Sequence, residues 1–193
     1  MNQVKEFGTA IRSTLILWLI VAVMYPLMML AVGELFVPFQ AHGSILRNRQ
    51  SQAIGSALIG QPFTSDKYFW SRPSTIDYSA GKTAAPTGGS GASNLAPSNP
   101  DLPKRTKVEI DRLKAAGIKP TNDLVYTSGS GLDPHISLES ARNQIPRVAR
   151  ARGLDTNKVE IIMTQSIEDR FLGIFGEPGV NVLNLNLALD KLT

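Results

Sequence analysis

The sequence lacks cysteine and has no long run of charge of one sign. Its 193 residues include no Cys and 2 His, and charged residues make up 19%. Without cysteine, disulfide frameworks, thiolate zinc sites and cysteine nucleophiles are excluded. The net charge of +4 is not gathered in a basic run, so the composition does not indicate nucleic-acid binding. A hydrophobic fraction of 42% can supply a folded core.

Charge is absent altogether from residues 13–33, a segment flanked by Arg12 and Glu34. A helix of this length spans about 31 Å, which matches the hydrocarbon core of a bilayer. We predict a tail over 1–12, a transmembrane helix over 13–34 and a soluble domain over 35–193. Pro26 falls inside the span, where a neighbouring helix or a local adjustment can satisfy the freed carbonyl.

A cleaved secretory signal and a buried soluble helix are the alternatives to this anchor. Lys5 and Arg12 would form the basic region of a signal, and Ala31-Val32-Gly33 offers small residues for cleavage. The apolar stretch exceeds the roughly 7–15 residues of a signal's apolar region, which favours an uncleaved anchor. The basic tail, with Glu34 as the first charge after the span, places the N-terminus in the cytoplasm and the rest outside.

Residues 35–193 predict a mixture of helices and strands. The whole chain is therefore predicted to be α+β, with one N-terminal transmembrane helix followed by a single loop-rich soluble domain. A hairpin is expected over 43–61. Two amphipathic segments with end signals predict helices over 104–116 and 138–152. The second has Ser137 as N-cap and Gly153 at its end, and Pro146 is expected to bend or divide it. Short apolar or alternating segments predict strands over 124–127, 159–165 and 180–189, with a Gly/Pro loop at 171–179.

Residues 81–103 hold four Gly and four Pro, a composition that excludes a regular element. The segment is then a flexible linker or an ordered functional loop. The mixed sequence SNLAPSNP at 93–100 is too varied for a Gly/Ser linker and favours an ordered loop.

Most motifs for catalysis or metal binding are incomplete in this sequence. His42 and His135 lie 93 positions apart without ligand-spaced companions, so no metal site is expected. The string Gly81-Lys82-Thr83 resembles the end of a phosphate-binding loop but lacks the first glycine. Ser90, His135 and Asp133 could in principle form a hydrolytic triad, but such triples occur in any chain by chance.

The segment SGSGLDPHIS, residues 128–137, offers successive backbone N–H groups before a helix. It can cradle an anion or a partner's carbonyl, or it can be a simple turn with Ser137 as the cap and His135 on the surface. The following helix carries four arginines, which form either a solvated face or a phosphate site: Arg142, Arg147, Arg150 and Arg152.

Several unusual strings follow the single span in a fixed order: GSALIGQPF (55–63), YFWSRPS (68–74), SNLAPSNP (93–100), SGSGLDPHIS (128–137) and GEPGVNVLNLNLALD (176–190). With these strings the chain resembles the family of C subunits of the bacterial Kdp potassium-transporting ATPase over essentially its whole length. Ala96 and Gly179 depart from the residues usual in that family and affect only local loop geometry.

The resemblance implies a non-catalytic subunit of a complex in the bacterial inner membrane. Its partners are a channel-like potassium-binding subunit, a P-type ATPase subunit phosphorylated on aspartate, and a very small single-span subunit. Two roles follow: stabilising assembly beside the channel-like subunit, and raising the ATP affinity of the pump subunit as a catalytic chaperone. Potassium is the transported ion, ATP is met through the pump subunit, and no covalently bound cofactor is expected.

The two roles require opposite sides of the membrane, because ATP is cytoplasmic and the charge pattern places the domain outside. Neutral Asn and Ser oxygens beside a potassium pore suit weak cation contact, and the partner- or pore-facing residues are then Asn94, Ser98, Asn99, Ser128, Ser130, Asp133 and His135. A nucleotide would instead contact Gln144 and Arg147. A membrane-anchored extracytoplasmic hydrolase or binding module is the alternative from another class.

Overall fold

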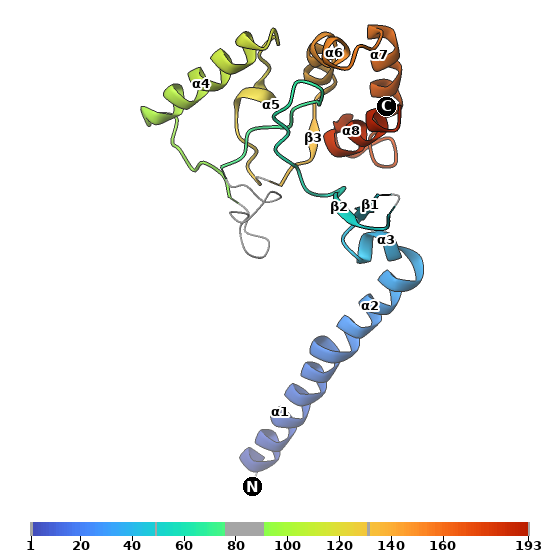
Figure 1. The fold of residues 1–193 in the computed structure, drawn as a ribbon. Helices are drawn as coiled ribbons and strands as arrows, with labels where there is room; N and C mark the ends of the chain where they lie inside the picture. The colour runs from blue at the N-terminus through green and yellow to red at the C-terminus, as the bar shows by residue number, and fades with distance from the viewer. Residues whose placement is uncertain (1, 49, 76–90, 131, 193) are drawn as a thin grey trace. The chain divides into compact units, whose positions relative to one another are not determined.

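The structure is a computed structural model that describes residues 2–48, 50–75, 91–130 and 132–192 (Figure 1). Helices and small sheets are mixed, so the α+β prediction is confirmed. The chain divides into two units, Met1–Ile45 and Leu46–Thr193. Residues 81–90 of the predicted loop over 81–103, including Gly81-Lys82-Thr83 and Ser90, lie outside the described residues.

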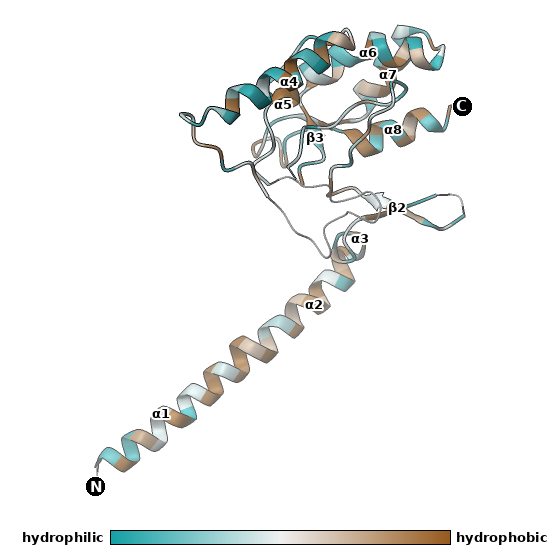
Figure 2. Ribbon diagram, turned by 60° about the vertical axis from the view of Figure 1, so that its left-hand side comes forward, coloured by the Kyte–Doolittle hydropathy of each residue, from teal (hydrophilic) through white to brown (hydrophobic). Residues whose placement is uncertain are grey.

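The first unit is helical almost throughout. Gln3–Phe36 is long and apolar enough to cross a membrane, and none of its apolar window is buried. Figure 2 shows hydrophobic residues along this helix. Its segments are α1 (Asn2–Leu19), a π-helical turn η1 (Ile20–Met24), α2 (Tyr25–Phe36) and the short α3 (Pro38–Ala41).

The π-helical turn lies immediately before Pro26. Proline has no N–H, so a continuous α-helix would leave the carbonyl of residue 22 without its donor. In the structure the Tyr25 N–H donates to the carbonyl of Ile20, five residues back. The wider turn is the kind of local adjustment expected for a proline inside a span.

The second unit begins with the predicted hairpin, β1 (Ile45–Arg47) and β2 (Ala53–Ser56), which form a two-stranded sheet. Asn48 closes the turn, because its Oδ1 accepts the Gln52 N–H at 2.9 Å. The two helix predictions are also confirmed. Helix α4 (Asp101–Ala115) starts three residues earlier than predicted, since Pro103 falls in the first turn, where N–H groups have no helical partner.

Helix α6 (Leu138–Arg152) has the predicted bounds and caps. The Ser137 hydroxyl accepts the Ser140 N–H at 3.1 Å, and Gly153 ends the helix in a left-handed conformation with φ +64°. Pro146 lies inside the helix without dividing it. The local sequence therefore determines both ends of this element.

The three strand predictions are wrong in whole or in large part. Residues 124 and 125 end the one-turn helix α5 (Asn122–Val125), and 126–127 belong to no strand. Residues 159–165 belong to α7 (Thr156–Gln165). Helix α7 is capped by Asp155, whose side chain accepts the Asn157 N–H, an N-cap signal that the strand prediction overlooked.

The third wrong prediction, 180–189, is strand only at its start. Strand β5 (Gly179–Asn181) leads into α8 (Val182–Asp190), which begins where the Asn181 side chain accepts the Asn184 N–H. Helix α8 buries Val182, Leu183, Leu185, Asn186 and Leu189. A helix surrounded by protein has little polar face, so the alternating pattern did not separate helix from strand.

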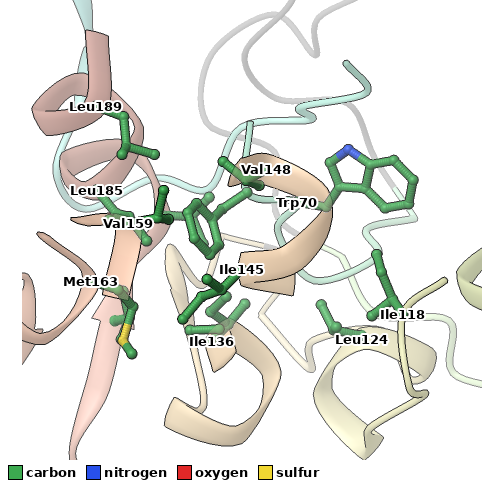
Figure 3. Packing of buried hydrophobic residues seen from close by; sticks show 14 of the residues in the cluster. Trp70, Ile118, Leu124, Ile136, Ile145, Val148, Val159, Met163, Leu185 and Leu189 are labelled. Carbon is green, nitrogen blue, oxygen red and sulfur yellow. The ribbon is translucent and has the colours of Figure 1, made fainter. Parts of the chain in front are cut away.

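A second sheet has the order β3-β5-β4, with β3 (His135–Ile136) and β4 (Ile167–Glu168) both antiparallel to β5. Val180 of β5 pairs with Ile136 on one side and Ile167 on the other. The side chains of α6, α7, α8 and the sheet meet in one core (Figure 3). The core residues include Phe69, Leu113, Leu124, Ile136, Ile145, Val148, Val159, Met163, Val180, Leu185 and Leu189.

Candidate functional site

Two side chains of α6 hold a backbone segment that lies outside any helix or strand. Gln144 is fully buried. The Trp70 N–H donates to its Oε1 at 2.8 Å, and its Nε2 donates to the Trp70 carbonyl at 3.2 Å. Arg147 donates to the carbonyls of Asp66 and Tyr68 at 2.8 and 2.9 Å. We call this set of contacts the α6 clamp.

Two further residues complete the support of the same segment. Asn186 of α8 binds the backbone of Phe69 in the same way as Gln144 binds that of Trp70. The Asn186 side chain accepts the Phe69 N–H at 2.8 Å and donates to the Phe69 carbonyl at 3.0 Å. Arg152 donates to the Lys67 carbonyl at 2.6 Å. Buried peptide groups need partners, and here amide side chains replace a neighbouring strand.

Arg147 is only 8% exposed, so it does not lie on a solvated helix face. Burial lowers its pKa to about 10, while the Asp66 carboxylate 3.4 Å away acts in the opposite direction; the guanidinium stays charged at neutral pH. Its Cζ lies 4.1 Å from the centroid of the Trp70 ring, and that of Arg112 lies 4.6 Å from the same ring. Arg147 thus holds the Trp70 ring as well as the backbone.

A pocket of about 350 Å³ lies next to Trp70. Its charged wall residues are two arginines and two carboxylates: Arg72, Arg112, Glu109 and Asp133. The remaining lining combines polar residues with glycine, proline and aromatic residues: Gly60, Gln61, Pro62, Phe63, Thr64, Trp70, Ser71, Pro73, Ser74 and Ser128. Each arginine is paired with one carboxylate, at 2.7 Å for Arg72–Asp133 and 2.8 Å for Arg112–Glu109. The four wall charges therefore balance, and the rest of the lining is mixed.

Asp133 links this pocket to the second sheet. Its Oδ1 accepts the His135 N–H at 3.0 Å and lies 3.7 Å from the His135 Nδ1. The other ring nitrogen lies 2.8 Å from a Glu168 oxygen. Gly60 packs against this turn so closely that an added Cβ would lie 2.8 Å from the Asp133 carbonyl, so only glycine fits there.

These charges shift the pKa values of His135 and Asp133 in opposite directions. The Asp133 carboxylate, and after it Glu168, raises the pKa of His135, while partial burial acts against the shift. Burial pushes the pKa of Asp133 upward, but hydrogen bonds from His135 and the Arg72 charge outweigh it and leave the pKa below its ordinary value. The Arg72–Asp133–His135–Glu168 row is thus most favourable when the histidine is protonated.

The structure brings together only part of the predicted partner-facing set. Ser128 and Asp133 line the pocket, and His135 lies beside Asp133. The Ser130 hydroxyl accepts the Leu132 N–H at 3.2 Å within the same turn.

Asn94, Ser98 and Asn99 are not among the pocket's described lining. Asn94 adopts φ +51°. Asn99 accepts the Asp101 N–H at 2.9 Å at the start of α4. The predicted partner-facing residues are therefore divided between the turn beside the pocket and a separate loop.

Sequence reasoning missed the residues on which the site is built. Trp70 and Arg72 occur in the string YFWSRPS without a predicted role, and Asn186 falls in the segment 180–189 that is predicted as a strand. The available signal was a polar residue inside an apolar run, since a buried amide must find a partner. No cluster of three or more metal-ligating side chains occurs within the part of the chain that the structure describes.

Comparison with known proteins identifies similar chains along the full length. The family described as "K+-transporting ATPase, c chain" matches residues 7–191. A potassium-transporting ATPase KdpC subunit of Microcystis aeruginosa is 58% identical over 213 residues, covering 100% of this chain and 98% of the relative. The Synechocystis counterpart is 56% identical, covering 98% and 100%, and that of Geobacter metallireducens 46%, covering 100% and 99%.

The α6 clamp predicts a large loss of stability when its hydrogen bonds are removed at constant volume. Gln144→Met leaves the buried N–H and carbonyl of Trp70 without partners and should cost about 2–4 kcal/mol of unfolding free energy. Chemical denaturation of the full chain in detergent measures it. Arg150→Ala, at an exposed position of the same helix, should cost no more than about 0.5 kcal/mol. Equal effects of the two changes would contradict the clamp.

The raised pKa of His135 predicts a stability contribution confined to low pH. The contribution is complete below the ordinary histidine pKa, because both states are then protonated, and it is lost as pH rises through the folded pKa. The stability difference between wild type and His135→Gln should therefore be larger at pH 5 than at pH 9. His42→Gln, in the other unit, is the control. A difference that grows with pH would disprove the assignment.

Proposed function

The chain belongs to the KdpC family, the c chain of K+-transporting ATPases, and we propose that it is the non-catalytic, membrane-anchored assembly subunit of its complex. It stabilises the channel-like potassium-binding subunit together with the P-type ATPase subunit and the very small single-span subunit. ATP is bound by the pump subunit, potassium passes through the complex, and this chain carries no covalently bound cofactor.

The α6 clamp is the observation that carries this proposal. Gln144 and Arg147 are the residues that a nucleotide would contact, yet both amide atoms of Gln144 and both terminal nitrogens of Arg147 serve the backbone of 66–70, and the Arg147 Nε is itself buried. A phosphate or base could reach them only after that segment had left the core. The geometry thus supports a structural use of these residues over a catalytic-chaperone role, in which they would raise the ATP affinity of the pump subunit.

The anchor supports a position outside the cytoplasm for the second unit. Lys5 and Arg12 precede the uncharged segment, and Glu34 is the first charge after it. Basic residues are retained on the cytoplasmic side, so we place the N-terminus there and Leu46–Thr193 in the periplasm. The domain is then separated from cytoplasmic ATP.

A periplasmic domain next to the potassium pathway would use its polar loops against partners. Exposed Asn94 and Ser98 carry neutral oxygen atoms, which contact a cation weakly and release it. The other five residues are engaged in turns and pairs, so their part in this proposal is to hold the loop shapes: Asn99, Ser128, Ser130, Asp133 and His135.

The test is a pair of reporters fused in turn after Thr193, one active only outside the cytoplasm and one fluorescent only inside it. We expect activity from the first and none from the second. The matched control carries Leu19→Arg and Val23→Arg, which together cost about 5–7 kcal/mol of insertion free energy and should retain both reporters inside. Fluorescence of the second reporter behind the wild-type span would overturn the periplasmic assembly role. It would favour the role in which this chain raises the ATP affinity of the pump subunit.

A further inference from the structure

Four large apolar side chains are exposed within five consecutive residues of the second unit. Phe171, Leu172, Ile174 and Phe175 are 71%, 74%, 72% and 62% exposed. We call residues 171–175 the FLGIF loop. Elsewhere in the described part of this unit the exposed large apolar residues are spread over the sequence: Leu58, Val108, Tyr126, Ile161 and Leu192. A concentrated apolar patch on a folded surface indicates an interaction site.

The FLGIF loop has an ordered backbone of its own. Phe171 and Phe175 form a β-bridge, with the Phe171 N–H donating to the Phe175 carbonyl at 2.9 Å and the reverse bond at 3.0 Å. Arg170 closes the base by donating to both carboxylate oxygens of Glu177, at 3.0 and 2.9 Å. The side chains are therefore held outward by a built turn.

Leu172 adds a second sign of a constrained surface. It adopts φ +54°, a left-handed conformation that favours glycine or asparagine over leucine. A large apolar residue is thus kept where neither burial nor backbone preference explains it. The loop joins β4 to β5, whose Val180 is fully buried, so the patch projects from the edge of the core. Such preorganisation lowers the entropic cost of docking.

We propose that the FLGIF loop docks into an apolar pocket, with a neutral or cationic rim, on another protein subunit of the complex. The charges around the loop favour protein over lipid. Residues 167–178 contain Glu168, Asp169 and Glu177 against Arg170 alone. With Glu177 paired to Arg170 and Glu168 to His135, Asp169 still leaves this rim acidic, so anionic lipid repels it. The loop also lacks the Trp, Tyr and Lys that anchor proteins at a bilayer surface.

The proposal rests on the proposed function only in taking the partner to be a subunit of the same complex. Apolar and aromatic side chains inserted into a dry pocket dominate the energetics of protein interfaces. Complementary charge at the rim then fixes the partner and its orientation. The FLGIF loop and its acidic surroundings provide both components.

The first experiment is co-purification of the complex carrying Leu172→Asn and Ile174→Ser. Asparagine accepts the left-handed conformation, so the melting temperature of the full chain in detergent should stay within about 2 °C of wild type or rise. Recovery of the partner subunits should fall about tenfold. The control, Val108→Ser with Ile161→Ser, removes two exposed apolar side chains from α4 and α7 and should leave recovery unchanged.

The second experiment places a photo-reactive amino acid at position 174 in the assembled complex. Crosslinks to another subunit support the proposal, whereas crosslinks to lipid alone, or to nothing, overturn it. Recovery of the partner subunits with the wild-type chain distinguishes failure of the assembly function from failure of the docking role. If the wild-type chain fails to co-purify, the assembly function is wrong; if wild type and the loop variant co-purify equally, only the docking role is wrong.

Discussion

The arrangement of the second unit depends on how residues 66–70 satisfy their peptide groups. Phe69 and Trp70 are buried, yet the segment has no strand beside it. Its partners are Gln144, Arg147 and Arg152 of α6 and Asn186 of α8, which reach across 74 or more positions of sequence. An unpaired buried peptide group is costly, so these four side chains determine where the segment can lie.

The pocket beside Trp70 follows from this constraint. Once the clamp fixes Trp70, the residues after it bring Arg72 to Asp133, and Asp133 orients His135 toward Glu168. Ion pairs account for the four charges of the wall, so little binding potential is left for a highly charged ligand. A subunit whose interior polar groups serve its own fold, and whose exposed loops and apolar patch face outward, fits an assembly role better than nucleotide binding.

The sequence predicted the elements with strong local signals and missed those decided by distant contacts. Ser137 and Gly153 define α6, and the uncharged segment beyond Arg12 defines the span, because capping and hydropathy act locally. Helix α8 falls in a segment that alternation predicts as a strand, because Asn184 and the buried Asn186 alternate with leucines without forming a solvent face. The clamp could not be predicted, since nothing near Gln144 in the sequence indicates that its amide pairs with Trp70. The apolar FLGIF loop was predicted only as a Gly/Pro loop.

Amide hydrogen exchange at Trp70 tests the clamp most directly. Its N–H has one acceptor, the Gln144 side chain at 2.8 Å, so in the wild-type chain it should exchange as slowly as amides of the central helices. In Gln144→Met it should exchange at least about tenfold faster than expected from the global loss of stability, while Phe69, held by Asn186, changes less. Equally fast exchange of Trp70 in wild type and variant would contradict the account.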